Sequence, residues 1–233
     1  YAQKSNFTKD EFKEAVQKEK SYIKSGDIFQ VVLSQKFERK TLASSTNIYR
    51  SLRRINPSPY LFHLKFQEFD IIGASPEMMV NVNQEIVNIR PIAGTRKRGE
   101  NDEEDKILSK DLLAEEKAEH LMLVDLGRND VGRVSKIGSV NVTEFMQIEK
   151  YSHVMHIVSN VIGKLRSSYD NYDALMSGFP AGTVTGAPKI RAMNIINELE
   201  SEPRGIYSGA VGFFDFKNNL NTCIAIRTIL HKG

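Results

Sequence analysis

Three glutamates and a histidine stand close together near the middle of the chain, within Leu112–Arg133. This stretch is rich in strong helix formers and contains no proline, so it predicts a helix. Residues three and four apart share a helix face, and this spacing is followed by Glu115, Glu116, Glu119 and His120. Crowded carboxylates repel one another unless a cation lies among them. Mg²⁺ is a hard cation that takes one or two carboxylates plus substrate oxygens and water. The pattern therefore predicts a magnesium site, and the alternative is a solvated helix face relieved by Lys117.

The rest of this helix predicts how it packs. Its apolar side is expected to consist of Leu113, Leu121, Met122, Val124 and Leu126. Polar side chains continue into a glycine-punctuated end, and they are Asp125, Arg128, Asn129, Asp130 and Arg133. We interpret this end as a buried polar network.

Two proline-containing segments hold further candidates. Ser75-Pro76-Glu77 lies between two predicted strands and is either a β-turn or a rigidly placed carboxylate at a strand end, where a general acid would be wanted. Arg90–Arg96 is predicted to be a rigid loop in which Gly94 lets the backbone approach a ligand closely. His153 and His156 lie in an apolar strand pattern, and each is either a hydrogen-bonded core residue or a reacting group.

The loop Phe179–Lys189 is the most unusual in the chain. It fits neither a Walker A loop nor a dinucleotide-binding fingerprint, because its glycine spacing and strand context differ. Pro188 suits the first turn of a helix that runs to about Glu200. The backbone N–H groups ahead of that helix are suited to an anion or a carboxylate.

The remaining elements must position these groups. A capping box at Thr8–Glu11 begins a helix that ends at Gly26. A second helix is predicted over Thr46–Ile55, and a short one near Tyr172–Met176. The strands are expected at Ile28–Phe37, Tyr60–Phe66, Phe69–Ala74, Met78–Asn83, Glu85–Arg90, Val140–Met146, Met155–Leu165, Ile206–Phe216 and Leu220–Leu230. This order predicts one α+β domain over residues 1–233 with a large, mostly antiparallel sheet.

Composition narrows the class of protein. A chain of 233 residues with 40% apolar and 26% charged residues is ordinary for a soluble globular protein. The net charge of +3 and the short run Arg96–Arg98, without interleaved aromatics, argue against nucleic-acid binding. No apolar run has transmembrane length and no secretory signal is present, so no membrane partner is expected. The single Cys223 fits a reducing compartment, and we expect a cytoplasmic protein.

Read together, these segments resemble the chorismate-utilising enzymes, and among them the large subunits of anthranilate synthases. The similarity runs over essentially the whole chain. It rests on NPSPYLF (56–62), GASPE (73–77), RPIAGTRKRG (90–99), AEHLMLVDLGRNDVGRV (118–134), YSHVMHIVSNV (151–161), FPAGTVTGAPKIRAM (179–193), RGIYSGAVG (204–212) and TCIAIRT (222–228). Chance does not explain eight motifs in the family's order. The resemblance implies part of an αββα sandwich with large, mostly antiparallel sheets.

The resemblance also implies which residues catalyse the reaction and bind the metal ion. The family moves a nucleophile onto the ring of chorismate while the C4 hydroxyl leaves, and Glu77 would protonate that hydroxyl. Mg²⁺ would hold the ring carboxylate and neutralise charge on the reacting ring. Glu119 matches a direct metal ligand of the family, and Glu116 matches one that acts through water.

Further residues match positions that hold the substrate. Tyr207 and Arg227 would bind the enolpyruvyl carboxylate, for which the forked donors of arginine are suited. Gly94, Thr95 and Thr183 would line the pocket. His156 matches a family histidine near the ring that would assist the later elimination of pyruvate.

Two positions indicate which branch of the family the chain resembles. In isochorismate and salicylate synthases a lysine at the position of Gln30 activates water, and in aminodeoxychorismate synthases a lysine nucleophile replaces Ala93. This sequence has neither lysine. The combination indicates anthranilate synthase, which converts chorismate and ammonia into anthranilate and pyruvate. The ammonia would come from a separate glutamine amidotransferase subunit.

The chain also departs from the family pattern. It begins at Tyr1 without the N-terminal half and the segment that binds the feedback inhibitor. Only one part of that inhibitor site is present, and it consists of Asn56, Pro57, Ser58, Pro59 and Tyr60. The chain stops at Gly233, before the glutamates of the second side of the metal site. Asn221 stands where aspartate is usual. We therefore expect an incomplete catalytic domain that is inactive alone. The alternatives are an aminodeoxychorismate synthase, or a non-catalytic module that binds chorismate or a partner.

Gln30 gives the first testable prediction. In the full-length polypeptide that carries this chain, Gln30→Lys introduces a base, so water should compete with ammonia and some isochorismate or salicylate should form. Product analysis without any ammonia source measures this. Unchanged products would mean that position 30 does not control the nucleophile.

Overall fold

The computed structural model describes residues 3–151 and 153–232, so Tyr1, Ala2, Ser152 and Gly233 lie outside the described residues. The chain forms two compact units, each assembled from segments distant in sequence. The first unit comprises residues 1–76, 180–211 and 223–233, and the second comprises residues 77–179 and 212–222. Helices alternate with antiparallel sheets, which confirms the predicted α+β class. The prediction of one domain over residues 1–233 stays a prediction.

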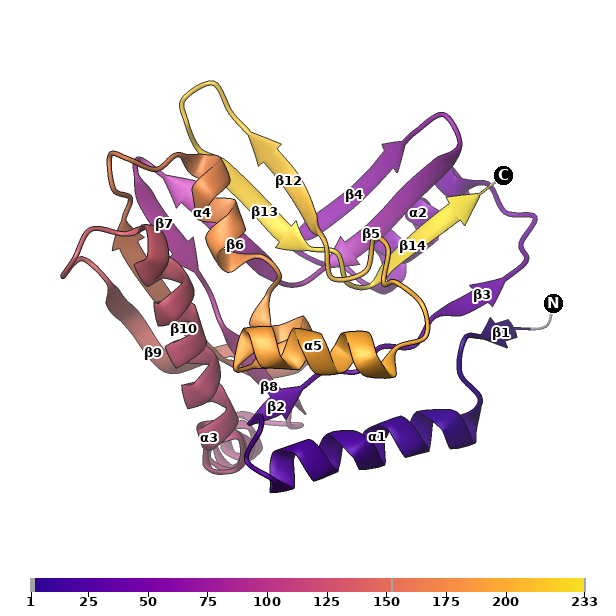
Figure 1. The fold of residues 1–233 in the computed structure, drawn as a ribbon, viewed down its shortest axis with the longest axis horizontal. Coiled ribbons are helices and arrows are strands. Elements are labelled where there is room, and N and C mark those ends of the chain that lie inside the picture. Colours follow the sequence, from indigo (N-terminus) through magenta and orange to yellow (C-terminus); the bar gives the residue numbers. More distant parts are fainter. Residues whose placement is uncertain (1–2, 152, 233) are drawn as a thin grey trace. The chain divides into compact units, whose positions relative to one another are not determined.

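The first unit is built from short sheets and helices (Figure 1). A three-stranded antiparallel sheet has the order β14 (Thr228–Lys232), β5 (Phe69–Ser75), β4 (Tyr60–Lys65), and α2 (Ser45–Ile55) packs on it. Two small pairs join β1 (Gln3–Ser5) to β3 (Phe37–Arg39), and β2 (Gln30–Val31) to β11 (Gly186–Ala187). The other helices are α1 (Lys9–Lys24), α5 (Lys189–Leu199) and the 3₁₀ turn Gly182–Val184.

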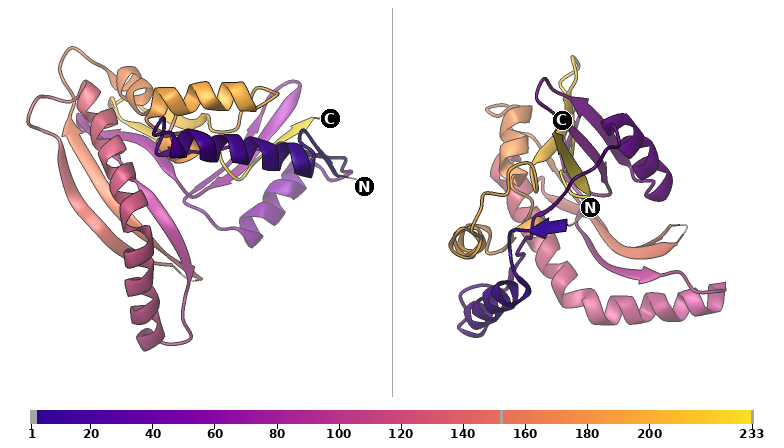
Figure 2. Two further views of the ribbon diagram at one scale, coloured as in Figure 1. Left: turned by 60° about the horizontal axis from the view of Figure 1, so that its bottom comes forward. Right: turned by 90° about the vertical axis from the view of Figure 1, so that its right-hand side faces the viewer.

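The second unit is organised by its sheet and by α3 (Asp102–Val134). The strand order is β12 (Ala210–Phe214), β13 (Leu220–Ile224), β6 (Met78–Asn83), β7 (Ile86–Ile89), β10 (Val154–Lys164), β8 (Ile92–Lys97), and only residues 212–222 of β12 and β13 belong to this unit. β10 pairs with β9 (Asn141–Lys150) along one edge and with β8 and then β7 along the other. α3 runs along β8 and β10 (Figure 2), and α4 (Asn171–Gly178) packs against α3 and β6.

Side chains that cap the first turn mark the starts of α1, α2 and α3. Thr8 caps α1 in a capping box with Glu11, and Ser44 caps α2. Asn101 accepts from two backbone N–H groups at the start of α3, and this helix of 33 residues begins before the predicted stretch Leu112–Arg133. None of the helices in the described part of the chain combines the length and the apolar character needed to cross a membrane.

Four strand predictions were wrong in extent. The strand predicted at Val140–Met146 continues in β9 to Lys150. Ile28–Phe37 is not one strand, because Val32, Ser34 and Lys36 donate to Thr185 O, a Glu200 carboxylate oxygen and Asn6 Oδ1 instead of to a neighbouring strand. Leu220–Leu230 divides into β13 and β14 near Arg227, whose φ is +49°. Ile206–Phe216 forms a strand only from Ala210 to Phe214, after a positive φ of 63° at Ser208.

Three predictions for the central region were also wrong. Arg90–Arg96 is not a loop, because β8 begins at Ile92 and pairs with β10. The predicted buried network at the end of α3 was wrong at four of its five residues: Asp130 is buried, whereas Asp125, Arg128, Asn129 and Arg133 are exposed. The apolar face of α3 is also rotated from the prediction: Leu121 is exposed, and the buried apolar residues are Leu112, Leu123, Val124, Val131 and Val134.

A carboxylate of α1 is buried in the first unit. Glu19 is 8% exposed and lies near the Glu200–Arg204 ion pair. Arg204 already donates to Glu200 and to the carbonyls of Val184 and Val32. Burial and repulsion from Glu200, partly offset by Arg204, raise the pKa of Glu19 to about 7.

This shift predicts how stability depends on pH. In the unfolded chain Glu19 titrates near ~4.3, so between that pH and about 7 the folded state keeps a proton that the unfolded state has lost. The free energy of unfolding therefore falls as pH rises through this window. We expect Glu19→Gln to raise Tm at pH 8 by a few degrees, at roughly 2–4 °C per kcal/mol, and to have little effect at pH 5. Thermal unfolding of both proteins measures this, with the exposed Glu14→Gln as control. Equal shifts at both pH values would contradict it.

Candidate active site

In the second unit, the backbone of β8 passes close to the glutamate side of α3 at Gly94. Gly94 has φ +65°, and a Cβ at this position would lie 2.8 Å from both Cγ of Glu116 and Cδ1 of Leu112. A side chain at position 94 would therefore displace Glu116 or the helix. The close approach predicted for Gly94 is present, and its neighbour is the carboxylate-bearing helix.

His156 lies on β10 beside the same part of β8. Its Nδ1 is 2.9 Å from the carbonyl oxygen of Gly94 and 3.1 Å from Oγ1 of Thr95. A carbonyl oxygen can only accept, so Nδ1 carries the proton and Nε2 of the neutral ring is left as an acceptor. The structure thus brings together three predicted site residues and gives one of them the tautomer of a base.

Glu116 and Glu119 lie one turn apart on α3, with Glu116 half-buried and Glu119 exposed. Their neighbour Glu115 forms an ion pair with Arg96 of β8, which sequence reasoning did not detect. Within the described ranges, no group of three or more His, Cys, Asp or Glu side chains could hold a metal ion. Two carboxylates on one helix still match the donor set of Mg²⁺ if substrate and water complete it.

His120 does not belong to this polar group. It is fully buried, and its Nε2 lies 2.7 Å from Oγ of Ser159 on β10. Burial lowers the pKa of His120 to about 4, so the ring is neutral. His120 is a core residue that joins α3 to the sheet, which corrects its predicted place among the carboxylates.

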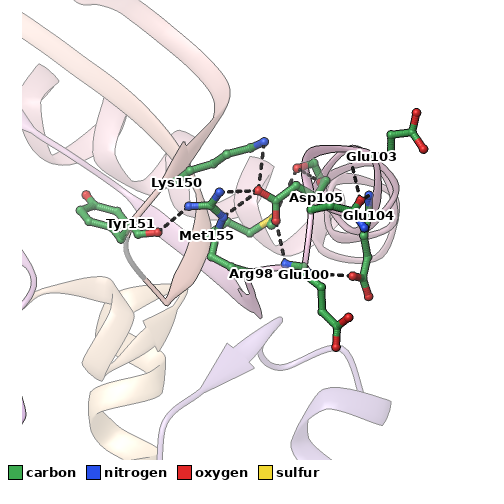
Figure 3. A network of polar contacts seen from close by, with 11 residues as sticks. Arg98, Glu100, Glu103, Glu104, Asp105, Lys150, Tyr151 and Met155 are labelled. Atoms are coloured by element: carbon green, nitrogen blue, oxygen red, sulfur yellow. Dashed lines mark hydrogen bonds and ion pairs between the residues drawn. The ribbon is translucent and has the colours of Figure 1, made fainter.

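A second ion pair missed at the sequence level lies at the start of α3 (Figure 3). Asp105 is 1% exposed and is bound by Arg98 at 2.7 Å and 2.6 Å, by the N–H of Gly99 at 2.7 Å and by Lys150 at 3.4 Å. Arg98 donates in turn to the carbonyl oxygens of Tyr151 and His153. The Tyr151 ring meets His156 edge-on, with ring centroids 5.7 Å apart.

The first unit holds another set of predicted residues. Gln30 pairs with Ala187 across β2 and β11, and a Cβ on Gly186 would lie 2.1 Å from the Gln30 carbonyl oxygen. Thr183 lies in the 3₁₀ turn just before β11. The Arg204 guanidinium lies 5.5 Å from the ring centroid of Tyr207.

The predicted inhibitor segment contacts a predicted substrate residue. Residues 56–60 connect α2 to β4, and Asn56 is the C-terminal cap of α2. Nη1 of Arg227 donates to Oδ1 of Asn56 at 3.2 Å, so the side chains of these two motifs meet within the first unit. Glu77 opens the second unit, half-buried and directly before β6.

Comparisons with known proteins extend over the whole chain. The family model for chorismate binding enzymes matches residues 1–233. The chain is 58% identical over 231 residues to anthranilate synthase component 1 of Aquifex aeolicus (strain VF5), covering 98% of this chain and 47% of that relative. It is 53% identical over 229 residues to aminodeoxychorismate synthase component 1 of Bacillus subtilis (strain 168), covering 97% of this chain and 49% of that relative.

A solved structure gives the same result. The crystal structure of anthranilate synthase component I from Streptococcus pneumoniae TIGR4 matches with a TM-score of 0.91 at 46% identity, covering all of this chain and 52% of that chain. The chain therefore spans about half the length of the relatives that it matches.

The contact between His156 and Gly94 can be tested directly. In long-range ¹H–¹⁵N spectra of the neutral imidazole, we expect the proton on Nδ1, because the carbonyl oxygen of Gly94 accepts it. Thr95→Val should leave this tautomer unchanged, since the main-chain acceptor remains. A neutral His156 protonated on Nε2 would contradict the assignment.

Proposed function

This chain belongs to the chorismate binding enzymes, and from that membership we propose that it is the catalytic part of an anthranilate synthase large subunit. The reaction would convert chorismate and ammonia into anthranilate and pyruvate. The observation that carries the proposal is the 58% identity to a protein of that name, together with glutamine at position 30 and alanine at position 93.

Glu77 would act as the general acid of the first half-reaction. Hydroxide is a poor leaving group, so the C4 hydroxyl of chorismate must be protonated as ammonia bonds to the ring at C2. A glutamate at the start of β6, beside the proline of the SPE motif, is a carboxyl group held at a strand end. The product of this step is aminodeoxyisochorismate.

Glu119 and Glu116 would hold a magnesium ion, Glu119 directly and Glu116 through water. The two carboxylates lie one turn apart on a helix that β8 approaches at Gly94. When bound, the ion would neutralise the ring carboxylate of the substrate and so fix the ring. The remaining ligands would be water and substrate oxygens.

Further residues would hold the enolpyruvyl part of the substrate. Tyr207 and Arg227 would bind its carboxylate, and Thr183 would line a substrate pocket. The planar guanidinium of Arg227 suits a carboxylate, and its contact with Asn56 would link this end of the substrate to the inhibitor motif NPSPY. We propose that residues 56–60 form one part of a feedback-inhibitor site.

His156 would assist the second half-reaction. There the C–H bond at the amine-bearing carbon and the C–O bond to the enolpyruvyl group break, the ring becomes aromatic, and enolpyruvate takes up a proton to become pyruvate. A base near the ring is needed to move that proton. Nε2 of His156 suits this role because the other ring nitrogen donates to Gly94.

The choice of nucleophile separates this proposal from its rivals. Glutamine at position 30 cannot act as the base that activates water, and alanine at position 93 cannot add to C2 as a lysine would. Ala93 is 5% exposed in β8, where it pairs with Ile157. Aminodeoxychorismate synthase is the second candidate because one relative of that name is 53% identical. Release of aminodeoxychorismate instead of anthranilate would favour it.

Ammonia would come from a glutamine amidotransferase subunit, the partner that a component 1 implies. We place the protein in the cytoplasm, which is consistent with a single cysteine that is free and buried. A non-catalytic chorismate-binding module remains the alternative of another class. Magnesium-dependent binding of chorismate without any turnover by the full-length polypeptide would favour that alternative.

Glu77→Gln tests the proposed acid. The substitution keeps shape and hydrogen bonding but cannot donate the proton, so kcat should fall by about 10²–10⁴-fold while KM for chorismate changes little. Anthranilate fluorescence in the full-length polypeptide with chorismate, ammonium and Mg²⁺ measures both constants. The exposed Glu68→Gln serves as control. A rise in KM with unchanged kcat would make Glu77 a positioning residue.

A further inference from the structure

The turn between β9 and β10 carries the aromatic ring that contacts His156. The backbone N–H of Tyr151 donates to the carbonyl oxygen of Val154 at 2.8 Å, which closes the turn. The Tyr151 ring then meets the His156 ring at an interplanar angle of 62°. The position of this turn therefore determines the position of the Tyr151 ring beside His156.

Arg98 fixes this turn from outside the hairpin. Its backbone N–H donates to the carbonyl oxygen of His153 at 3.1 Å, and Nη1 donates to the carbonyl oxygen of Tyr151 at 2.9 Å (Figure 3). Arg98 directly follows β8, whose last residue, Lys97, pairs with Val154. One arginine thus holds two carbonyl groups of the turn that strand pairing leaves available.

Asp105 in turn orients Arg98. Nε and Nη2 of Arg98 both bind Oδ2 of Asp105, and the N–H of Gly99 binds Oδ1. The adjacent guanidinium and the N–H of Gly99 hold the pKa of Asp105 well below its usual range, so it stays ionised. Because Asp105 is buried and is bound by donors from Arg98, Gly99 and Lys150, its carboxylate is fixed and holds the Arg98 guanidinium in one direction.

The Tyr151 side chain has a second anchor. Its hydroxyl donates to Oε2 of Glu149 at 2.7 Å, and Glu149 forms an ion pair with Arg90. The ring is therefore held from its main chain by Arg98 and at its tip by Glu149. Tyr151 itself is 43% exposed, so these polar contacts hold it in place more than burial does.

We propose that the buried Asp105–Arg98 pair is a positioning device for His156, acting through the Tyr151 ring. The inference rests on the proposed function, in which His156 serves the elimination of pyruvate and Glu77 serves the amination. Loosening the pair should therefore slow the second half-reaction more than the first. The enzyme would release more of its turnover as aminodeoxyisochorismate.

The experiment measures both products of the full-length polypeptide with chorismate, ammonium and Mg²⁺. Asp105→Asn and Tyr151→Ala should each raise the ratio of released intermediate to anthranilate, by up to about tenfold for a small misplacement. Chorismate consumption should fall less than this ratio rises. Tyr151→Phe keeps the ring and the main-chain anchor but loses the hydroxyl contact with Glu149, so its ratio should rise less than that of Tyr151→Ala. Asp111→Asn makes the same chemical change at an exposed position of α3 and should change nothing.

A second variant separates positioning from instability. Asp105→Asn leaves the half-buried Arg98 guanidinium without its carboxylate partner and lowers stability, whereas Arg98→Met with Asp105→Leu removes both charges. We expect the double variant to recover Tm but to keep the raised product ratio. A double variant with the parent ratio would overturn the proposal.

His156→Ala distinguishes failure of this inference from failure of the proposed function. If His156→Ala leaves the product ratio unchanged, the proposed role of His156 fails. If it raises the ratio and Asp105→Asn does not, only the positioning inference fails. Imidazole chemical shifts of His156 in ¹³C-histidine-labelled full-length protein give a readout without turnover. They should change alike in Asp105→Asn and Tyr151→Ala, and parent-like shifts in both would overturn the proposal.

Discussion

The second unit depends on the absence of a side chain at position 94. Because a Cβ there would strike Glu116 and Leu112, only glycine lets β8 lie this close to α3. The carbonyl group of the same residue meets His156, so one residue fixes a strand relative to both a carboxylate helix and an imidazole. The Arg96–Glu115 ion pair adds a second connection between the same two elements. In tight packing of this kind, a displacement of one element also moves its neighbours. A few contacts are therefore enough to hold the candidate site.

In the first unit, a charged side chain holds separate segments together. Arg204 binds Glu200 and two carbonyl oxygens, and in doing so joins β2, the 3₁₀ turn and the end of α5. It lies 12% exposed, so its hydrogen bonds operate where water competes little. Gly186 then allows the backbone of β11 to approach Gln30. Both units thus use a glycine to bring backbones together and a buried or half-buried guanidinium to hold a non-helical segment.

The sequence predicted the local elements better than the contacts between them. Capping side chains such as Thr8 and Ser44 act within a few residues, so the helix starts could be inferred from spacing. The strand break at Arg227 could not be inferred, because a positive φ in a non-glycine residue has no sequence signal. The resemblance identified Gly94, Thr95 and His156, and the structure places them together. The Asp105–Arg98 pair was missed because its role depends on the contact of Arg98 with Tyr151, 53 residues further along the chain. Spacing in the sequence does not reveal such a contact.

The proton position on His156 rests on an acceptor that mutation cannot delete. In many sites a carboxylate side chain fixes the tautomer of a histidine, and one substitution abolishes that control. Here the acceptor is the main chain of residue 94, which every amino acid would provide. Evolution is therefore free to change Thr95 and the surroundings of the ring without reversing the roles of its two nitrogens. A designer who wishes to reverse them would have to move the strand itself.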